Sequence, residues 1–230
     1  CTGAPLDAGL KRRIQQHWPG GLREIYGLTE GGCSCVLDAD AFPDKLGTVG
    51  KPAPNHDMRL IDEAGRVVPP GEPGEIVGRS PYMMAGYYKR PEATEAFYWH
   101  DETGAVFHRS GDIGRFDADG FLILLDRKKD MIISGGFNIY AADLEVILAA
   151  HPDVLEATVI GVPSAQWGET PLALVVPTAA STIGADALLQ WANAQVGRTQ
   201  RLSAVEYRRE LPRSALGKVL KRELRQAYWP

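Results

Sequence analysis

Residues 126–130 have the sequence DRKKD, five consecutive charged side chains within a chain of 230 residues. On composition alone, such a run fits a solvated surface and a functional hinge equally well. The pattern of the sequence differs on its two sides, which predicts a division of the chain into residues 1–127 and 128–230. A chain of this length is sufficient for two domains.

The N-terminal side of the charged run begins with a predicted helix over residues 7–18 and a short buried strand at 23–26. Between residues 46 and 125, short alternating apolar runs are separated by clusters of Gly, Pro and Asp. This spacing predicts a small β-rich unit with tight turns. Residues 117–120, with the sequence DADG, predict a hairpin turn in which Gly120 takes a positive φ.

The C-terminal side mixes helices and strands, which predicts a compact α+β unit. A strand is expected to end at residues 134–136, and Leu144, Ile147 and Leu148 predict the buried face of a helix over 141–150. Further elements are expected as strands at 156–162, 172–176 and 205–211, a helix at 185–196 and a final helix from residue 219.

Composition excludes several classes of function. The net charge of −4 gives no electrostatic reason to expect nucleic acid as a partner. No apolar run approaches the ~18 residues of a transmembrane segment. Cys1, Cys33 and Cys35 do not fit a disulfide framework or a zinc site, so we expect packing residues in a reducing, cytoplasmic compartment. Because the chain begins at Cys1 without Met, we expect a fragment, in which the lack of a signal peptide says nothing about targeting.

Two motifs on the N-terminal side suggest nucleotide chemistry. Residues 26–32, with the sequence YGLTEGG, combine glycines for close backbone approach, a hydroxyl for a phosphate and a carboxylate for Mg²⁺. In residues 109–112, RSGD, the Asp112 carboxylate could accept from two adjacent ribose hydroxyls. Taken singly, a polar turn and a capping aspartate explain these motifs better.

Two further motifs lie on the C-terminal side. Residues 132–139, IISGGFNI, place paired glycines after an apolar strand, where a ligand could pass close to the backbone. Residues 211–218, LPRSALGK, place Lys218 on a glycine-containing loop, where an ammonium could reach a carboxylate and a phosphate. A loop needing positive φ and an ordinary exposed lysine are the simpler interpretations of each motif alone.

The order of these segments, together with residues 2–6 and 86–94, resembles the acyl-adenylate-forming superfamily of AMP-forming acyl-CoA synthetases, adenylation domains and beetle luciferases. The resemblance covers the whole chain and implies the C-terminal part of such an enzyme. Residues 1–127 would end the large domain, with an αβ remnant at 1–45 and a small β-barrel-like subdomain at 46–127. Residues 128–230 would form a mobile α+β lid.

The resemblance also implies how ATP and the lid are held. Gly3, Ala4 and Pro5 would lie against the adenine, and Asp112 would bind the ribose hydroxyls with help from Arg127. Tyr26 would lie beside the nucleotide and the acyl site, Thr29 would contact the α-phosphate, and Glu30 would bind Mg²⁺. Gly135 and Gly136 would line the tunnel for the pantetheine arm of coenzyme A. Lys129 would be the hinge residue, and Lys218 would act in the adenylation step.

The implied reaction activates a fatty or aromatic carboxylic acid with ATP and passes the acyl group to coenzyme A. The family's phosphate loop would lie upstream of Cys1, so we expect these 230 residues alone to be inactive or a weak nucleotide binder. Two alternatives stay open: an adenylation domain that loads a carrier protein, and a non-catalytic binding or regulatory module. The identity of the acid and the oligomeric state are not predicted.

Overall fold

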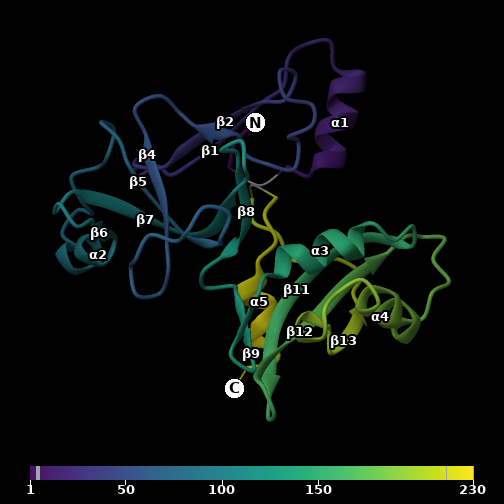
Figure 1. Cartoon of the computed structure of the whole chain (residues 1–230). Helices are drawn as coiled ribbons and strands as arrows, with labels where there is room; N and C mark the ends of the chain where they lie inside the picture. The colour runs from purple at the N-terminus through teal and green to yellow at the C-terminus, as the bar shows by residue number, and fades with distance from the viewer. Residues whose placement is uncertain (4–5, 216, 230) are drawn as a thin grey trace. The chain divides into compact units, whose positions relative to one another are not determined.

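The computed structural model describes residues 1–3, 6–215 and 217–229. The chain forms two compact units, Cys1–Leu124 (unit 1) and Leu125–Pro230 (unit 2), whose elements Figure 1 labels. Each has its own buried core, and the fold class is α+β, as the sequence predicts. Ala4 and Pro5 lie outside the described residues.

Unit 1 opens with a helix close to the one predicted over residues 7–18. The helix α1 covers Ala8–His17, and the Asp7 carboxylate caps it by accepting from the Leu10 amide at 2.9 Å. Its fully buried side chain is Lys11, whereas Trp18 lies beyond the helix and is 63% exposed. The helix is followed by β1 (Arg23–Gly27), β2 (Ser34–Asp38) and β3 (Lys51–Pro52), which form an antiparallel sheet in the order β1-β2-β3.

The expected buried strand at 23–26 is β1, but only Glu24 on it is buried. Ile25 is 46% exposed, so the expectation of a fully buried strand is wrong. The next strand, β2, carries Cys35 into the unit 1 core, and Cys33 lies just before it. Both thiols are free and buried, and burial raises the pKa of Cys33 to about 12. Cys33 and Cys35 are packing residues, as predicted, whereas Cys1 is exposed and the prediction is wrong for it.

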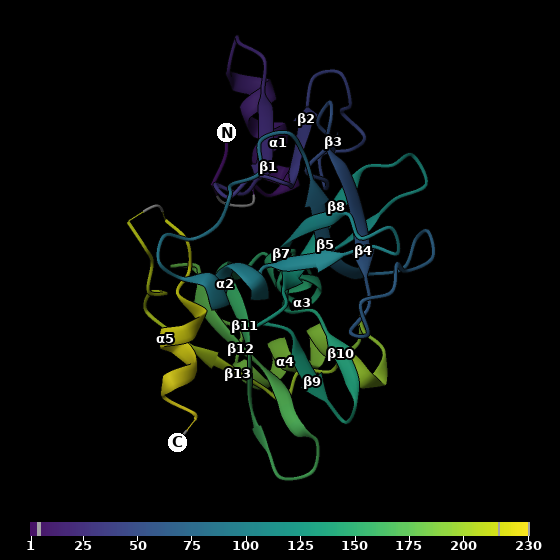
Figure 2. The same ribbon diagram turned by 90° about the vertical axis from the view of Figure 1, so that its left-hand side faces the viewer.

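The second sheet of unit 1 has five strands. Its elements are β4 (Asp57–Ile61), β5 (Gly74–Arg79), β6 (Tyr98–His100), β7 (Val106–Phe116) and β8 (Leu122–Arg127), with α2 (Pro91–Ala96) before β6. The order is β4-β5-β7-β6, with β8 pairing with β7. Figure 2 labels β4, β5, β7 and β8 of this sheet. The alternating runs at residues 105–108 and 112–116 belong to one continuous strand, because β7 pairs with β5 along both halves. The predicted 117–120 turn is present, with Gly120 at φ +80°.

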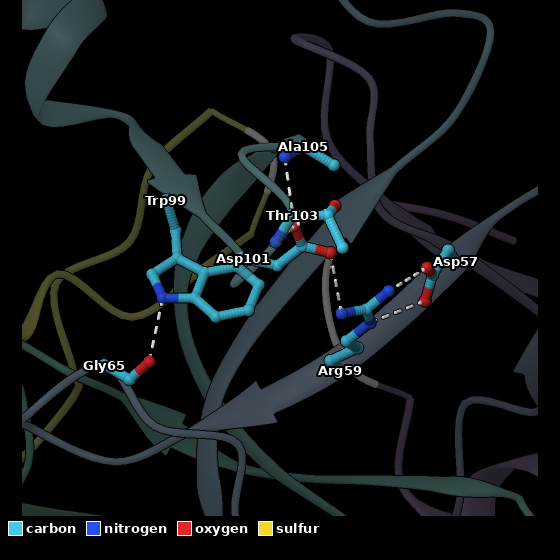
Figure 3. Close-up of polar contacts among 7 residues, drawn as sticks. All are labelled: Asp57, Arg59, Gly65, Trp99, Asp101, Thr103 and Ala105. Atoms are coloured by element: carbon cyan, nitrogen blue, oxygen red, sulfur yellow. Dashed lines mark hydrogen bonds and ion pairs between the residues drawn. The ribbon is translucent and has the colours of Figure 1, made fainter.

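A network around Arg59 ties the β6–β7 turn to the edge strand β4 (Figure 3). Its guanidinium donates to Asp101 at 3.1 Å and to Asp57 at 2.7 Å. Asp101 also accepts from the amides of Thr103 and Ala105, so one carboxylate closes the turn and joins it to strand β4. These bonds hold the Asp101 pKa at about 2, with the Thr103 hydroxyl contributing most.

Unit 2 has one five-stranded sheet with helices packed on it. Its elements are β9 (Ile132–Ser134), β10 (Phe137–Ile139), α3 (Ala141–Ala149), β11 (Val154–Ser164), β12 (Gly168–Pro177), α4 (Ala185–Asn193), a 3₁₀ turn (Arg198–Gln200), β13 (Ala204–Tyr207) and α5 (Lys221–Gln226). The order is β10-β9-β12-β11, and β13 pairs in parallel with β12. The last strand, β13, ends at Tyr207, whereas the predicted strand runs to residue 211. The last helix, α5, begins at Lys221, two residues after the predicted start at 219.

The strands β11 and β12 of unit 2 are buried on both faces. Val159 packs in the cluster under α3 and α4, whereas its neighbour Ile160 packs in the cluster that includes α5. Such two-sided burial requires an almost continuous apolar run, which 172–176 shows. Leu144 and Leu148 of α3 are buried and Ile147 is partly buried, so the predicted face of this helix is confirmed.

The structure adds detail at both ends of β9. The strand ends at Ser134, as predicted, and both glycines after it take positive φ. They form the turn of a hairpin, because Phe137 pairs with Ser134 across them. The charged run is also not simply solvated. The Arg225 guanidinium of α5 donates to the carbonyls of Lys129 and Asp130 at 2.9 and 2.8 Å. No helix within the described residues is long and apolar enough to cross a membrane.

Candidate functional site

Asp112 lies in a bulge of β7 that changes the direction of its carboxylate. Val77 pairs with Arg109 and Glu75 with Ile113, so β7 advances four residues while β5 advances two. A bulge bends its strand and turns side chains out of the regular alternation. Gly111, within the bulge, takes φ +69°, and Asp112 is only 8% exposed.

The carboxylate of Asp112 is held by a residue 86 positions earlier. The Tyr26 hydroxyl, on β1, donates to Asp112 Oδ2 at 2.8 Å. Burial, followed by the charge of Asp112, raises the Tyr26 pKa, so the phenol stays protonated and remains a donor. The sequence predicted both residues as nucleotide contacts, and the structure brings them together.

Thr29 and Glu30 lie in the turn that follows β1. Gly31 and Gly32 take φ +76° and +85° and let other chain segments approach closely. A Cβ on Gly31 would lie 2.2 Å from the Tyr82 carbonyl oxygen, and one on Gly32 would lie 2.6 Å from that of Gly78. Both positions therefore require glycine. The glycines shape the turn so that it carries an exposed hydroxyl and a half-buried carboxylate.

Tyr87 is a site residue to which the sequence assigned no role. Its hydroxyl donates to Glu30 Oε1 at 2.7 Å. Burial and the Glu30 carboxylate raise the Tyr87 pKa to about 12. The signal in the sequence was the segment 86–94, which carried part of the family resemblance but gave no indication of the contact, because the partners are 57 residues apart.

The segment 1–3 lies along β1. Thr2 forms a parallel bridge with Ile25, and the Cys1 carbonyl accepts from the Ile25 amide at 2.8 Å. Gly3 is exposed with φ +93°. Of the three predicted adenine contacts, Gly3 is the one within the described residues. The Leu6 amide, further along the chain, donates to the Glu24 carboxylate at 3.2 Å.

Lys218 of unit 2 lies exposed on a short hairpin loop. Arg213 and Val219 form an antiparallel bridge, and the Ser214 amide donates to the Lys218 carbonyl at 2.8 Å. The Ser214 hydroxyl in turn accepts from the Lys218 amide at 3.2 Å. Arg213 also forms an ion pair with Glu156 on β11. The described residues at both ends of this loop are therefore joined to each other, and Arg213 is joined to the sheet of unit 2.

Gly135 and Gly136 form the tip of the β9–β10 hairpin, with φ +57° and +83°. The Gly135 amide donates to the Trp167 carbonyl at 2.9 Å, and the indole lies directly against it. The remaining predicted positions lie at the end of β8, a strand that begins in unit 1 and ends in unit 2. Arg127 is the last residue of that strand, and Lys129 follows in the turn with an exposed side chain.

The side chains of unit 1 fit a magnesium ion bound with a nucleotide. Among the described residues, no group of three or more His, Cys, Asp or Glu is arranged to hold a metal by itself. Mg²⁺ is usually bound through one or two carboxylates together with substrate phosphates and water, so the single Glu30 carboxylate is consistent with it.

Comparison with known proteins extends this picture. The family model of the AMP-binding enzymes matches residues 1–88, and the model of the AMP-binding enzyme C-terminal domain matches residues 143–218. A feruloyl-CoA synthase from Amycolatopsis is 42% identical over 231 aligned residues, covering 99% of this chain and 45% of that protein. A long-chain fatty acid–CoA ligase from Yersinia pestis is 39% identical, covering 97% and 39%.

Solved structures of similar proteins superpose on almost the whole of this chain. ATP-bound MatB from Rhodopseudomonas palustris superposes with a TM-score of 0.88 at 34% identity, covering 99% of this chain and 44% of that one. The o-succinylbenzoate-CoA synthetase of Bacillus subtilis, solved with its acyl-adenylate intermediate, gives 0.81 at 32% identity, covering 97% of this chain and 44% of that one. The chain spans about 45% of the length of its first curated relatives. On these grounds, the chain belongs to the AMP-binding enzyme superfamily.

Proposed function

We propose that this chain is part of an AMP-forming acid–thiol ligase that converts a fatty or aromatic carboxylic acid to its coenzyme A thioester with ATP. The observation that carries the proposal is the Tyr26–Asp112 contact. It holds a carboxylate at 8% exposure, in a strand bulge, by a neutral phenol donor. A carboxylate fixed this way suits the paired hydroxyls of a ribose. The acyl-CoA ligases among the relatives support the same reaction class.

In the adenylation step, a carboxylate oxygen of the acid attacks the α-phosphorus of ATP and pyrophosphate leaves. Asp112 holds the ribose, with Arg127 assisting, and Gly3 lies against the adenine. The Thr29 hydroxyl donates to the α-phosphate. Glu30 is the residue that would hold Mg²⁺, which supplies positive charge beside the phosphates when bound. Lys218 opposes the negative charge that builds on the α-phosphate.

In the thioester step, the coenzyme A sulfur attacks the carbonyl carbon of the acyl-adenylate, the thiol gives up its proton, and AMP leaves. Gly135 and Gly136 line the path of the pantetheine arm, because glycines allow close approach to the backbone. Unit 2 turns about Lys129 between the two steps, so that it presents first Lys218 and then the glycine hairpin.

The test uses the full-length protein that carries this chain. Incubation with ATP, coenzyme A and a panel of fatty and aromatic acids should yield AMP and an acyl-CoA, identified by mass spectrometry. Lys218→Ala should abolish pyrophosphate exchange but spare thioester formation from supplied acyl-adenylate. Absence of AMP with every acid would refute the proposed reaction, and equal loss of both half-reactions would refute the role of Lys218.

A further inference from the structure

The segment 82–87 crosses the turn at 28–32 and contacts it at three points. The Met84 amide donates to the Glu30 carbonyl at 2.8 Å. The backbone of residues 82–83 lies so close to Gly31 that a Cβ there would meet the Tyr82 carbonyl at 2.2 Å. The Tyr87 hydroxyl donates to the Glu30 carboxylate at 2.7 Å. The main chain and the side chain of Glu30 are therefore fixed by one segment.

Tyr87 is itself held in place, so its hydroxyl is a directed donor. Its amide donates to the Thr94 hydroxyl at 2.9 Å, and that hydroxyl donates to the Arg90 carbonyl at 3.0 Å. Its ring packs edge-on against Phe97 with centroids 5.7 Å apart. A donor whose ring is fixed by packing loses less conformational freedom when it makes its hydrogen bond.

The hydrogen bond from Tyr87 selects one orientation of the Glu30 carboxylate. A carboxylate has two oxygens, and the phenol occupies a lone pair of Oε1, which leaves Oε2 as the oxygen to coordinate a cation. A partner that fixes the orientation of a ligating carboxylate raises its affinity for a metal. Without this partner, an acidic side chain on a turn would have to order itself when the metal binds.

We propose that Tyr87 is a positioning residue for the Glu30 carboxylate, which it holds ready to bind the divalent cation that accompanies the nucleotide. This inference rests on the proposed function, because it takes Glu30 as the metal ligand. It adds a residue outside the 26–32 turn to the machinery and assigns a role to the segment 82–87.

The test compares Tyr87→Phe with Tyr88→Phe in the full-length protein that carries this chain. Tyr88 is the matched control because it is the adjacent tyrosine and its side chain is 86% exposed. Binding of Mn²⁺ is measured by electron paramagnetic resonance in the presence of a non-hydrolysable ATP analogue. Removing one hydrogen bond to a charged group should weaken Mn²⁺ binding about tenfold in Tyr87→Phe. Tyr88→Phe should bind as the wild type does.

Two further measurements separate positioning from folding. The Mg²⁺ concentration for half-maximal adenylation should rise about tenfold in Tyr87→Phe, with kcat at saturating Mg²⁺ changed less. The unfolding temperature of this variant should stay close to that of Tyr88→Phe. If both variants bind Mn²⁺ equally while the wild type binds it with the nucleotide, the role of Tyr87 is refuted. If the wild type binds no Mn²⁺ with the nucleotide, the proposed function fails instead.

Discussion

Replacing Glu24 by Gln should destabilise unit 1 far more than its position on a half-exposed strand suggests. Glu24 forms an ion pair with Lys11 of α1, and the two side chains are 3% and 2% exposed. The Lys11 ammonium also donates to the carbonyls of Leu46 and Thr48 at 2.8 and 2.9 Å. The other carboxylate oxygen of Glu24 accepts from the Leu6 amide. One buried pair therefore joins the helix, strand β1 and two loops.

The magnitude follows from what the substitution leaves behind. Glutamine fits the same volume and its amide oxygen can still accept from Leu6, so little packing is lost. The Lys11 ammonium, however, stays buried with two carbonyl acceptors and no counter-charge. Removing one partner of a buried ion pair costs about 3–5 kcal/mol. Because the two carbonyls remain, we expect the free energy of unfolding to fall by ~3 kcal/mol, at the lower end of this range.

The neighbouring residue supplies the control. Arg23, on the same strand, pairs with Asp38 at 3.3 Å, but its side chain is 72% exposed. An exposed pair contributes about 0–1 kcal/mol, so Arg23→Gln should change little. The double variant Lys11→Met with Glu24→Leu should recover part of the stability, because no charge stays buried. Recovery should be incomplete, since the Leu46 and Thr48 carbonyls lose their donor.

The assay is urea unfolding of the whole chain, monitored by amide hydrogen exchange with mass spectrometry. Peptides from unit 1 and unit 2 then report separately. Glu24→Gln should lower the unfolding free energy of unit 1 peptides by ~3 kcal/mol. Equal losses in Glu24→Gln and Arg23→Gln would show that the pair contributes no more than an exposed one, and would refute the reasoning.

Three further outcomes are expected. Burial lowers the pKa of His108, so the unfolded chain binds its proton more readily and unit 1 should lose stability as the pH falls below about 6.5; His108→Phe should remove this dependence in urea unfolding at pH 7.5 and 5. Gly135→Ala and Gly136→Ala should each cost about 1 kcal/mol through positive φ. Only the first should move the ¹⁹F resonance of the neighbouring labelled tryptophan, because its Cβ would lie 2.8 Å from the indole. The Asp101 carboxyl should titrate by NMR near pH 2, below the usual pH for an aspartate, and Thr103→Ala should raise this midpoint. The contribution of Asp101 to stability is present above its unfolded pKa and is lost as the pH falls through about 2.

Local sequence signals predicted most helices and strands of this fold because local contacts decide them. The Asp7 cap and the 117–120 turn are examples, since Asp117 accepts from the amides of Asp119 and Phe121 within the same turn. The spacing of Leu144, Ile147 and Leu148 likewise predicted the buried face of α3. The glycine pair at 135–136 was interpreted as a loop that needs positive φ, and both glycines take it.

Features that depend on distant partners could not be predicted in the same way. The helix predicted over residues 7–18 gave no indication that Lys11 would be its buried side chain. A buried lysine is explained only by Glu24 and the two carbonyls that it contacts, which lie elsewhere in the chain. The β7 bulge is similar, because it exists only relative to β5.

The candidate site shows the same division between contacts with distant residues and contacts within one loop. Asp112 and Glu30 are held by residues 86 and 57 positions away, so their geometry depends on the folded unit 1. Lys218 is held by Ser214 only four positions away, within unit 2. Weakening unit 1 through Glu24→Gln should therefore loosen the nucleotide contacts while the Lys218 loop keeps its protection in hydrogen exchange. Equal loss of protection at both would mean that the two units unfold as one, and that the Lys218 loop depends on more than its own local contacts.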